Sequence, residues 1–203
     1  MRRRRTLQTR STRCGSTSAA TWKRTATDDI ERLVEAARAL AERTGHAVVI
    51  IGGVARSVWA SPRATQDLDV IYSGPLPEAV AAAPHIGHVA LPNEVAALAD
   101  ALMTRLRLPQ RLTGPVRMDV IAASHPYYDR LIARSRRLGQ GGLRVAAPED
   151  IILLKLIADR PQDRADVRAI IAAQGGLLDR ALLAEEAATQ ELVLPDDLET
   201  PTI

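Results

Sequence analysis

The 203-residue sequence contains no phenylalanine and only five aromatic side chains, two Trp and three Tyr. Its 46% hydrophobic content is enough for one sizeable core, which must be built mainly from Ala, Val, Ile and Leu. So few aromatic rings argue against a surface that binds nucleic acid by base stacking. The single cysteine, Cys14, excludes an intramolecular disulfide and fits a reducing compartment, so we expect a cytoplasmic protein. No stretch approaches 18 consecutive apolar residues, so we expect no membrane-spanning helix and no membrane partner.

Acidic residues are absent from residues 1–27, which hold eight basic groups. Residues 28–203 carry the other 19 basic groups and all 24 acidic ones, so their net charge is near −5. Residues 1–27 are rich in Ser and Thr and show no apolar period, which predicts a disordered basic tail. Three interpretations of this tail stay open: a solvated or wrongly assigned upstream extension, an arm that contacts RNA, and an organellar targeting peptide.

Secondary structure is predicted from hydrophobic periodicity and from the positions of Gly and Pro. Helices are predicted at 27–45, 54–60, 93–108, 148–160, 162–174 and 178–192, and strands at 46–51, 67–72, 116–122 and 143–146. These elements predict a mixed α/β (α+β) fold. We expect a disordered tail at 1–27, a core at 28–147, C-terminal helices packed on that core at 148–192, and a second tail at 193–203.

Two short motifs carry the first chemical signal. Gly52 and Gly53 follow a predicted strand and open a helix, where backbone N–H groups and the helix dipole favour a phosphate. Asp67 and Asp69 lie two residues apart in the next strand, so their carboxylates project to the same face. Carboxylates this close repel each other, and a hard divalent cation relieves the repulsion. The alternative interpretations are a simple turn and a solvated strand edge.

A third carboxylate, Asp119, lies in the apolar strand predicted at 116–122. Its burial costs several kcal/mol unless the group is paired or metal-bound. If this strand lies beside the one at 67–72, then Asp67, Asp69 and Asp119 can together hold Mg²⁺ around a nucleoside triphosphate. Such an arrangement supports in-line phosphoryl or nucleotidyl transfer.

The order and spacing of these residues resemble the signature of the polymerase-β-type nucleotidyltransferase superfamily: Gly52-Gly53, thirteen intervening residues, Asp67-Leu68-Asp69, and a later strand with Asp119. The resemblance implies a small mixed sheet flanked by helices and a dependence on Mg²⁺. It also implies transfer of a nucleoside monophosphate from a nucleoside triphosphate (NTP) to an acceptor hydroxyl, with release of pyrophosphate.

Within this superfamily the sequence is similar to the AbiEii-like toxin branch, whose members show an Arg and a Thr just before the metal-binding pair, here Arg63 and Thr65. The similarity continues in a later motif, here Lys155, Arg160, Asp163 and Asp166, and departs from it at Gln162, where members often carry a basic residue. This branch implies a transfer RNA (tRNA) acceptor and a cognate antitoxin as partners.

Site residues follow from both lines of reasoning. We predict that Asp67 and Asp69 bridge metal to phosphate oxygens, and that Asp119 binds a second metal and helps deprotonate the acceptor hydroxyl. Lys155, one of only two lysines, suits a triphosphate or the departing pyrophosphate. The predicted catalytic set is Asp67, Asp69, Asp119, Lys155, Asp163 and Asp166, and the predicted nucleotide-binding set is Gly52, Gly53, Arg56, Arg63 and Thr65.

Alternatives remain open for several of these residues. Lys155 can equally be a lysine at the edge of an amphipathic helix, and Asp163 can cap a helix or pair with Arg160. The pair Tyr127-Tyr128 is better explained by helix packing than by base stacking. At the level of function, the alternatives are nucleotidyl transfer to a small molecule such as an aminoglycoside, and a catalytically silent nucleotide-binding module.

Overall fold

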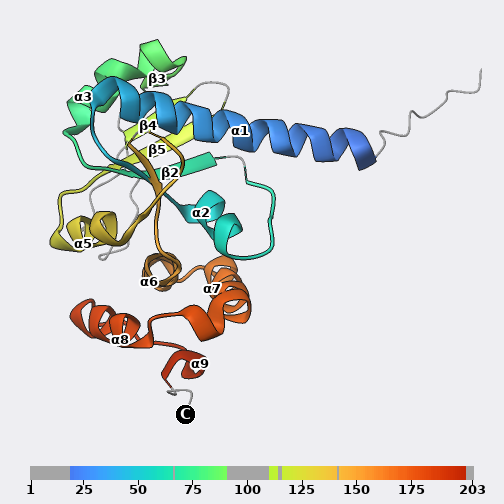
Figure 1. The fold of residues 1–203 in the computed structure, drawn as a ribbon, viewed down its shortest axis with the longest axis vertical. Coiled ribbons are helices and arrows are strands. Elements are labelled where there is room, and N and C mark those ends of the chain that lie inside the picture. The colour runs from blue at the N-terminus through green and yellow to red at the C-terminus, as the bar shows by residue number, and fades with distance from the viewer. Residues whose placement is uncertain (1–18, 66, 91–109, 114–115, 141, 200–203) are drawn as a thin grey trace, which may run out of the picture.

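The computed structural model describes residues 19–65, 67–90, 110–113, 116–140 and 142–199 (Figure 1). Its strands are β1 (Val48–Ile51), β2 (Asp67–Tyr72), β3 (Val89–Ala90), β4 (Gln110–Thr113), β5 (Arg117–Ala122), β6 (Arg136–Arg137) and β7 (Leu143–Val145). Its α-helices are α1 (Ala19–Thr44), α2 (Gly52–Trp59), α3 (Leu76–Ala82), α5 (Pro126–Arg134), α6 (Pro148–Ala158), α7 (Pro161–Gln174), α8 (Arg180–Thr189) and α9 (Asp196–Glu199), and 3₁₀ turns lie at Ala83–Ile86 and Gly175–Leu177. The helix predicted at 93–108 lies outside the described residues.

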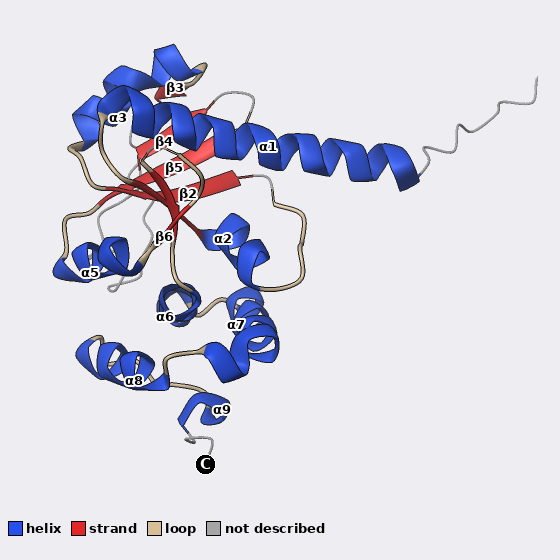
Figure 2. Cartoon of the chain, viewed as in Figure 1, coloured by secondary structure: helices blue, strands red, loops and turns tan. Residues whose placement is uncertain are grey.

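The strands form one mixed sheet in the order β3-β4-β5-β2-β1-β7-β6 (Figure 2). Strand β2 runs antiparallel to β1 and parallel to β5, and β1 runs parallel to β7. The strand predicted at 116–122 therefore does lie beside the one at 67–72. This pairing brings Asp119 into register with the Asp67–Asp69 motif.

Helices cover both faces of the sheet. Figure 1 shows α1 and α3 on one side, and α2, α5 and α6 on the other, with α7, α8 and α9 beyond them. Helix α1 packs on β1, β2, β7 and α3, while α2 packs on β1 and β2 and also on α6 and α7. Helix α2 therefore connects the sheet with the C-terminal helices.

The core between these layers consists of Ala, Val, Ile and Leu, as the composition predicts, together with Met118 and the three tyrosines. Tyr72, Tyr127 and Tyr128 are all almost fully buried. The rings of Tyr127 and Tyr128 lie 5.9 Å apart in α5, which confirms their role in packing. All four residues of β1 are buried, as its β-branched sequence indicated.

Helix α1 begins earlier than predicted. It starts at Ala19, eight residues before Thr27, so the prediction of a disordered tail over 1–27 is wrong for residues 19–27. These residues include Ala, Lys and Arg, which favour helix, and extending an existing helix costs far less than nucleating one. At the other end, the tail predicted at 193–203 contains the short helix α9.

Several short elements were not predicted, and α5 shows why. It begins at Pro126, a favourable first helical residue, after His125, whose Nδ1 accepts a hydrogen bond from the Tyr127 backbone N–H at 3.2 Å. Histidine is not one of the preferred N-cap residues, so Pro126 alone did not lead to a predicted helix here. In the described part of the chain, no helix is both long enough and apolar enough to cross a membrane.

Candidate active site

The predicted carboxylates come together on adjacent strands. In the parallel pair β2–β5, Asp69 lies opposite Asp119 and Asp67 lies opposite Arg117. On the other side of β2, Asp69 lies opposite Ile51, the last residue of β1. Side chains at paired positions of neighbouring strands project to the same face. The end of β1, where α2 starts, is therefore next to all three carboxylates.

The glycine pair permits a very close approach between α2 and this face. Gly52 has a left-handed backbone conformation, with φ near +63°, and a Cβ there would overlap Oδ2 of Asp69 and lie 3.0 Å from its Cγ. A Cβ on Gly53 would lie 3.0 Å from Oγ1 of Thr65. Only glycine at position 52 leaves room for the Asp69 carboxylate, so the first turn of α2 lies directly against the site.

The pKa of the Asp69 carboxyl group is strongly raised. Burial, followed by the neighbouring carboxylates of Asp67 and Asp119, raises its pKa to about 6, although Lys155 and Arg160 act to lower it. The mutual repulsion predicted from the sequence is therefore present. A pKa near neutrality is common among groups that bind cations or handle protons.

Asp67 is held by two side chains at the rim of the site. Thr65 donates a hydrogen bond from Oγ1 to Oδ1 of Asp67 at 3.2 Å, and Arg117 donates from Nη2 to Oδ2. Thr65, predicted to bind nucleotide, thus supports a carboxylate in this structure. Arg117 was not predicted, although its place two residues before Asp119 in a strand puts both side chains on one face.

The three carboxylates fit a metal site in their chemistry. They are hard oxygen donors on one face, and their repulsion is what a divalent cation would relieve. Among the described residues, no group of three or more His, Cys, Asp or Glu side chains is arranged closely enough to hold a metal ion. The fold therefore brings the three carboxylates to one face, but they do not converge on a single point. Asp67 is paired with Arg117.

The later motif forms an ionic network around two buried carboxylates. Asp159 ends α6 in a left-handed conformation and Pro161 starts α7, so the two helices meet at a tight turn. This turn brings Lys155, only 7% exposed, to Asp163 and Asp166: its Nζ lies 2.6 Å from Oδ1 of Asp163 and 3.0 Å from Oδ2 of Asp166. The Lys155 ammonium is thus held between two buried carboxylates.

Asp163 also receives a hydrogen bond from Arg160, with Nε 2.5 Å from its Oδ2. Burial alone would raise the pKa of Asp163, but the hydrogen bonds from Arg160 and Lys155 outweigh it and lower the pKa. The pairing of Asp163 with Arg160 that the sequence left open is therefore present. Arg160 and Lys155 also lower the pKa of Asp69, so this network and the strand carboxylates share one electrostatic environment.

Asp166 connects the network to the glycine helix. Its Oδ1 lies 3.1 Å from Nε of Arg56 in α2, and its Oδ2 lies 3.2 Å from Nη2 of Arg63 in the loop before β2. With its amide oxygen facing the guanidinium, Gln162 accepts from Nη1 of Arg63 at 2.7 Å. Arg56 and Arg63, predicted to contact phosphates, are thus bound to Asp166, and Arg56 is buried.

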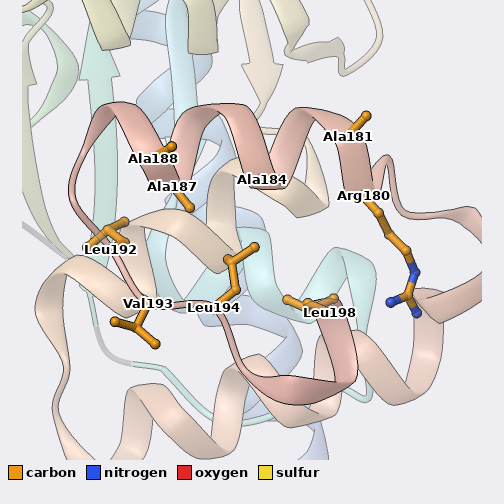
Figure 3. A pocket seen from close by; sticks show the side chains of 9 residues that line it. All are labelled: Arg180, Ala181, Ala184, Ala187, Ala188, Leu192, Val193, Leu194 and Leu198. Atoms are coloured by element: carbon orange, nitrogen blue, oxygen red, sulfur yellow. The ribbon is translucent and has the colours of Figure 1, made fainter. Parts of the chain in front are cut away.

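A cavity of about 630 Å³ lies away from these residues (Figure 3). It is formed by α8 and the segment that follows, with Ala184, Ala188, Leu192 and Val193 among its lining residues. The charged lining residue, Arg180, donates a hydrogen bond to the backbone oxygen of Asp197 at 2.7 Å. Since its lining includes no carboxylate, this cavity has none of the groups that the predicted chemistry requires.

The fold is shared with solved nucleotidyltransferase structures. The antibiotic-resistance factor ANT(2'')-Ia, studied in solution, superposes with a TM-score of 0.54 and 16% identity, over 82% of this chain and 97% of that one. The same factor in complex with adenylyl-2''-tobramycin gives 0.51 and 15%, over 84% and 98%. An antigenic nucleotidyltransferase-like protein from Paracoccidioides brasiliensis gives 0.50 and 14%, over 82% and 90%. At these identities the likeness establishes the fold alone.

A comparison with curated proteins finds no match. A family model does match, over residues 28–187, a range that contains both the strand carboxylates and the Lys155 network. This match agrees with the nucleotidyltransferase superfamily predicted from the sequence, while the AbiEii-like toxin branch within it stays a prediction. The chain belongs to the family of nucleotidyltransferases of unknown function designated DUF6036.

Proposed function

We propose that the protein is a Mg²⁺-dependent enzyme that transfers a nucleoside monophosphate from an NTP to an acceptor hydroxyl. The observation that carries this proposal is the register of Asp69 with Asp119, directly beside the glycine start of α2. Carboxylates for a cation and backbone N–H groups for a phosphate thus lie next to each other.

In this reaction the acceptor oxygen attacks the α-phosphorus of the NTP, and the bond from that phosphorus to the bridging oxygen of pyrophosphate breaks. The hydroxyl proton passes to a carboxylate, which we assign to Asp119, and pyrophosphate leaves with the bonding electrons. Gly52 and Gly53 bring their backbone N–H groups to the triphosphate. Mg²⁺, held by Asp67, Asp69 and Asp119, would supply charge neutralisation on the phosphate oxygens.

The Lys155 network sets the positions of these groups. Asp166 holds Arg56 of α2 and Arg63 of the loop that leads to Asp67, and Lys155 pairs with both Asp163 and Asp166. We therefore assign Lys155, Asp163 and Asp166 a positioning role in this conformation. For Lys155 to bind the pyrophosphate, as the sequence motif suggested, its ammonium would have to leave both carboxylates.

For the acceptor we propose RNA, specifically the end of a tRNA, as in a toxin with a cognate antitoxin. The support is the motif Lys155, Arg160, Asp163, Asp166 with its AbiEii-like spacing, and the eight basic groups in residues 1–27. A small-molecule acceptor is the competing candidate, because ANT(2'')-Ia, which shares the fold, has been solved with adenylyl-2''-tobramycin.

The test is incubation of the protein with each α-labelled NTP and Mg²⁺, in parallel with total tRNA and with tobramycin. We expect label on tRNA, and we expect loss of that label in Asp69→Asn. Asp129→Asn, an exposed aspartate of α5, is the matched control and should keep full activity. Label on tobramycin alone would replace the RNA assignment, and label on neither acceptor, despite NTP binding, would support a silent module.

A further inference from the structure

Arg117 is the one basic residue in a group of four side chains at paired positions of β2 and β5. The register pairs Arg117 with Asp67 and Asp119 with Asp69, so the Arg117 side chain faces the same side of the sheet as the three carboxylates. Its guanidinium donates a hydrogen bond to one of these carboxylates, at Oδ2 of Asp67. Arg117 thus neutralises one of the three proposed metal ligands.

This ion pair differs from the Lys155–Asp163 pair in its exposure. The side chains of Arg117 and Asp67 are 46% and 34% exposed, whereas those of Lys155 and Asp163 are 7% and 1% exposed. Exposed pairs contribute little to stability and are screened by solvent, while breaking a buried pair leaves a charge without compensation. The Arg117–Asp67 pair can therefore open at small cost, and the Lys155 network cannot.

We propose that Arg117 is an exchangeable counter-cation for Asp67. Arg117 releases the Asp67 carboxylate when a divalent cation binds. This inference rests on the proposed metal-dependent function. Arg117 is a positioning residue in this scheme: it holds Oδ2 of Asp67 in an ion pair until a cation replaces it. After release its guanidinium remains at the rim of the site, where it can meet an anionic phosphate group.

The exchange predicts a competition that can be measured without any nucleotide. We expect Arg117→Gln to bind Mn²⁺ about twofold to fivefold more tightly than the wild type in calorimetry, because the competing cation is gone. The matched control is Arg164→Gln, which removes another exposed Arg–Asp pair, the one with Asp159 at the α6–α7 turn. We expect no change in Mn²⁺ affinity for this control.

A change in affinity alone can also come from the loss of a nearby positive charge, so a direct readout is needed. Phenylglyoxal modifies accessible guanidinium groups, and peptide mass spectrometry locates the modified arginines. In the wild type we expect Mg²⁺ alone to increase the modification of Arg117 several-fold, and to leave that of Arg164 unchanged. A structural role of Arg117, with the pair intact in both states, would give no such increase.

The outcomes separate this inference from the proposed function. If the wild type transfers nucleotides but Mg²⁺ leaves Arg117 modification unchanged, or if Arg117→Gln binds Mn²⁺ no better than the wild type, the exchange is overturned and the function stands. If no acceptor is labelled but Mg²⁺ exposes Arg117 as expected, the exchange stands without the function. If Mn²⁺ binds neither the wild type nor Arg117→Gln, both are overturned.

Discussion

Gly52 lies so close to Asp69 that no other residue type fits at its position. Its φ is near +63°, and a Cβ would overlap Oδ2 of Asp69. A residue other than glycine at position 52 would thus have both a strained backbone and a steric overlap with Asp69. This position follows the end of β1, next to the strand that carries the first two carboxylates. The glycine pair therefore does more than form a turn, since it leaves space for the Asp69 side chain.

The first prediction is that Gly52→Ala reduces transfer activity at least about a hundredfold, because the new methyl group displaces Asp69 and small displacements in a reacting site are this costly. The measurement is the labelled-NTP assay with the best acceptor. Gly87→Ala is the control, since Gly87 has a similar φ of +74° but open space around a Cβ. It should lose some stability from backbone strain and keep its activity. Equal losses of activity in both variants would contradict a steric conflict between the new methyl group and Asp69.

The second prediction concerns the pH dependence of stability in metal-free buffer. The pKa of Asp69 is raised from about 3.8 to about 6, so the folded protein binds a proton that the unfolded chain has lost between these values. The contribution of Asp69 to the free energy of unfolding therefore falls as the pH rises through this window.

Asp69→Asn removes this contribution. We expect the variant to match the wild type near pH 4 and to be more stable by about 2 to 3 kcal/mol above pH 6. Urea unfolding at several pH values in the presence of a chelator measures the difference. A constant difference across the window would show that burial does not perturb Asp69.

The third prediction is that Lys155→Met lowers the free energy of unfolding by about 1.5 to 3 kcal/mol, because it removes the buried ammonium that bonds Asp163 and pairs with Asp166, while arginines still compensate both carboxylates. Urea unfolding again provides the measurement. Arg164→Gln, which removes an exposed and solvent-screened pair, should leave the urea midpoint nearly unchanged. Similar small losses in both variants would indicate that Lys155 is not needed for stability.

The fourth prediction concerns a second buried network, which fixes α8 on the core. Asp150 at the start of α6 is fully buried, and Arg134 of α5 lies 2.6 Å from its Oδ1 and 2.8 Å from Oε1 of Glu186 in α8. Tyr127 also donates to Asp150, at 3.1 Å. We expect Arg134→Met to cost about 3 to 5 kcal/mol of unfolding free energy.

Tyr127→Phe is the matched comparison and should cost about 1.5 to 3 kcal/mol, because it removes one hydrogen bond to a charged group but leaves the ion pair. Denaturant unfolding followed by circular dichroism measures both variants. A larger loss for Tyr127→Phe than for Arg134→Met would reverse the assignment of Arg134 as the main counter-ion of Asp150.

The sequence predicted the parts of the fold that depend on local pattern. The strand at Asp67–Tyr72 was predicted with its observed bounds, and the end of α6 before Pro161 follows from a residue that cannot continue a helix. The start of α1 was missed because a single cap-like residue, Thr27, outweighed the helix-forming residues before it. The strand β6 has too few residues for a period to be read, and α5 was missed because its N-cap is a histidine.

For the site, the spacing of Asp67 and Asp69 was enough to place both carboxylates on one face, since alternation along a strand is a local property. The amino-acid sequence by itself also determined the glycine pair and the order of the motifs, and with them the nucleotidyltransferase superfamily. It did not determine what those side chains contact. Only the register of β5 against β2 placed Asp119 beside Asp69 and Arg117 beside Asp67, and only the α6–α7 turn enclosed Lys155 between two aspartates. Such contacts join residues about 8 to 50 positions apart, and they depend on strand pairing and helix packing, which no local pattern encodes.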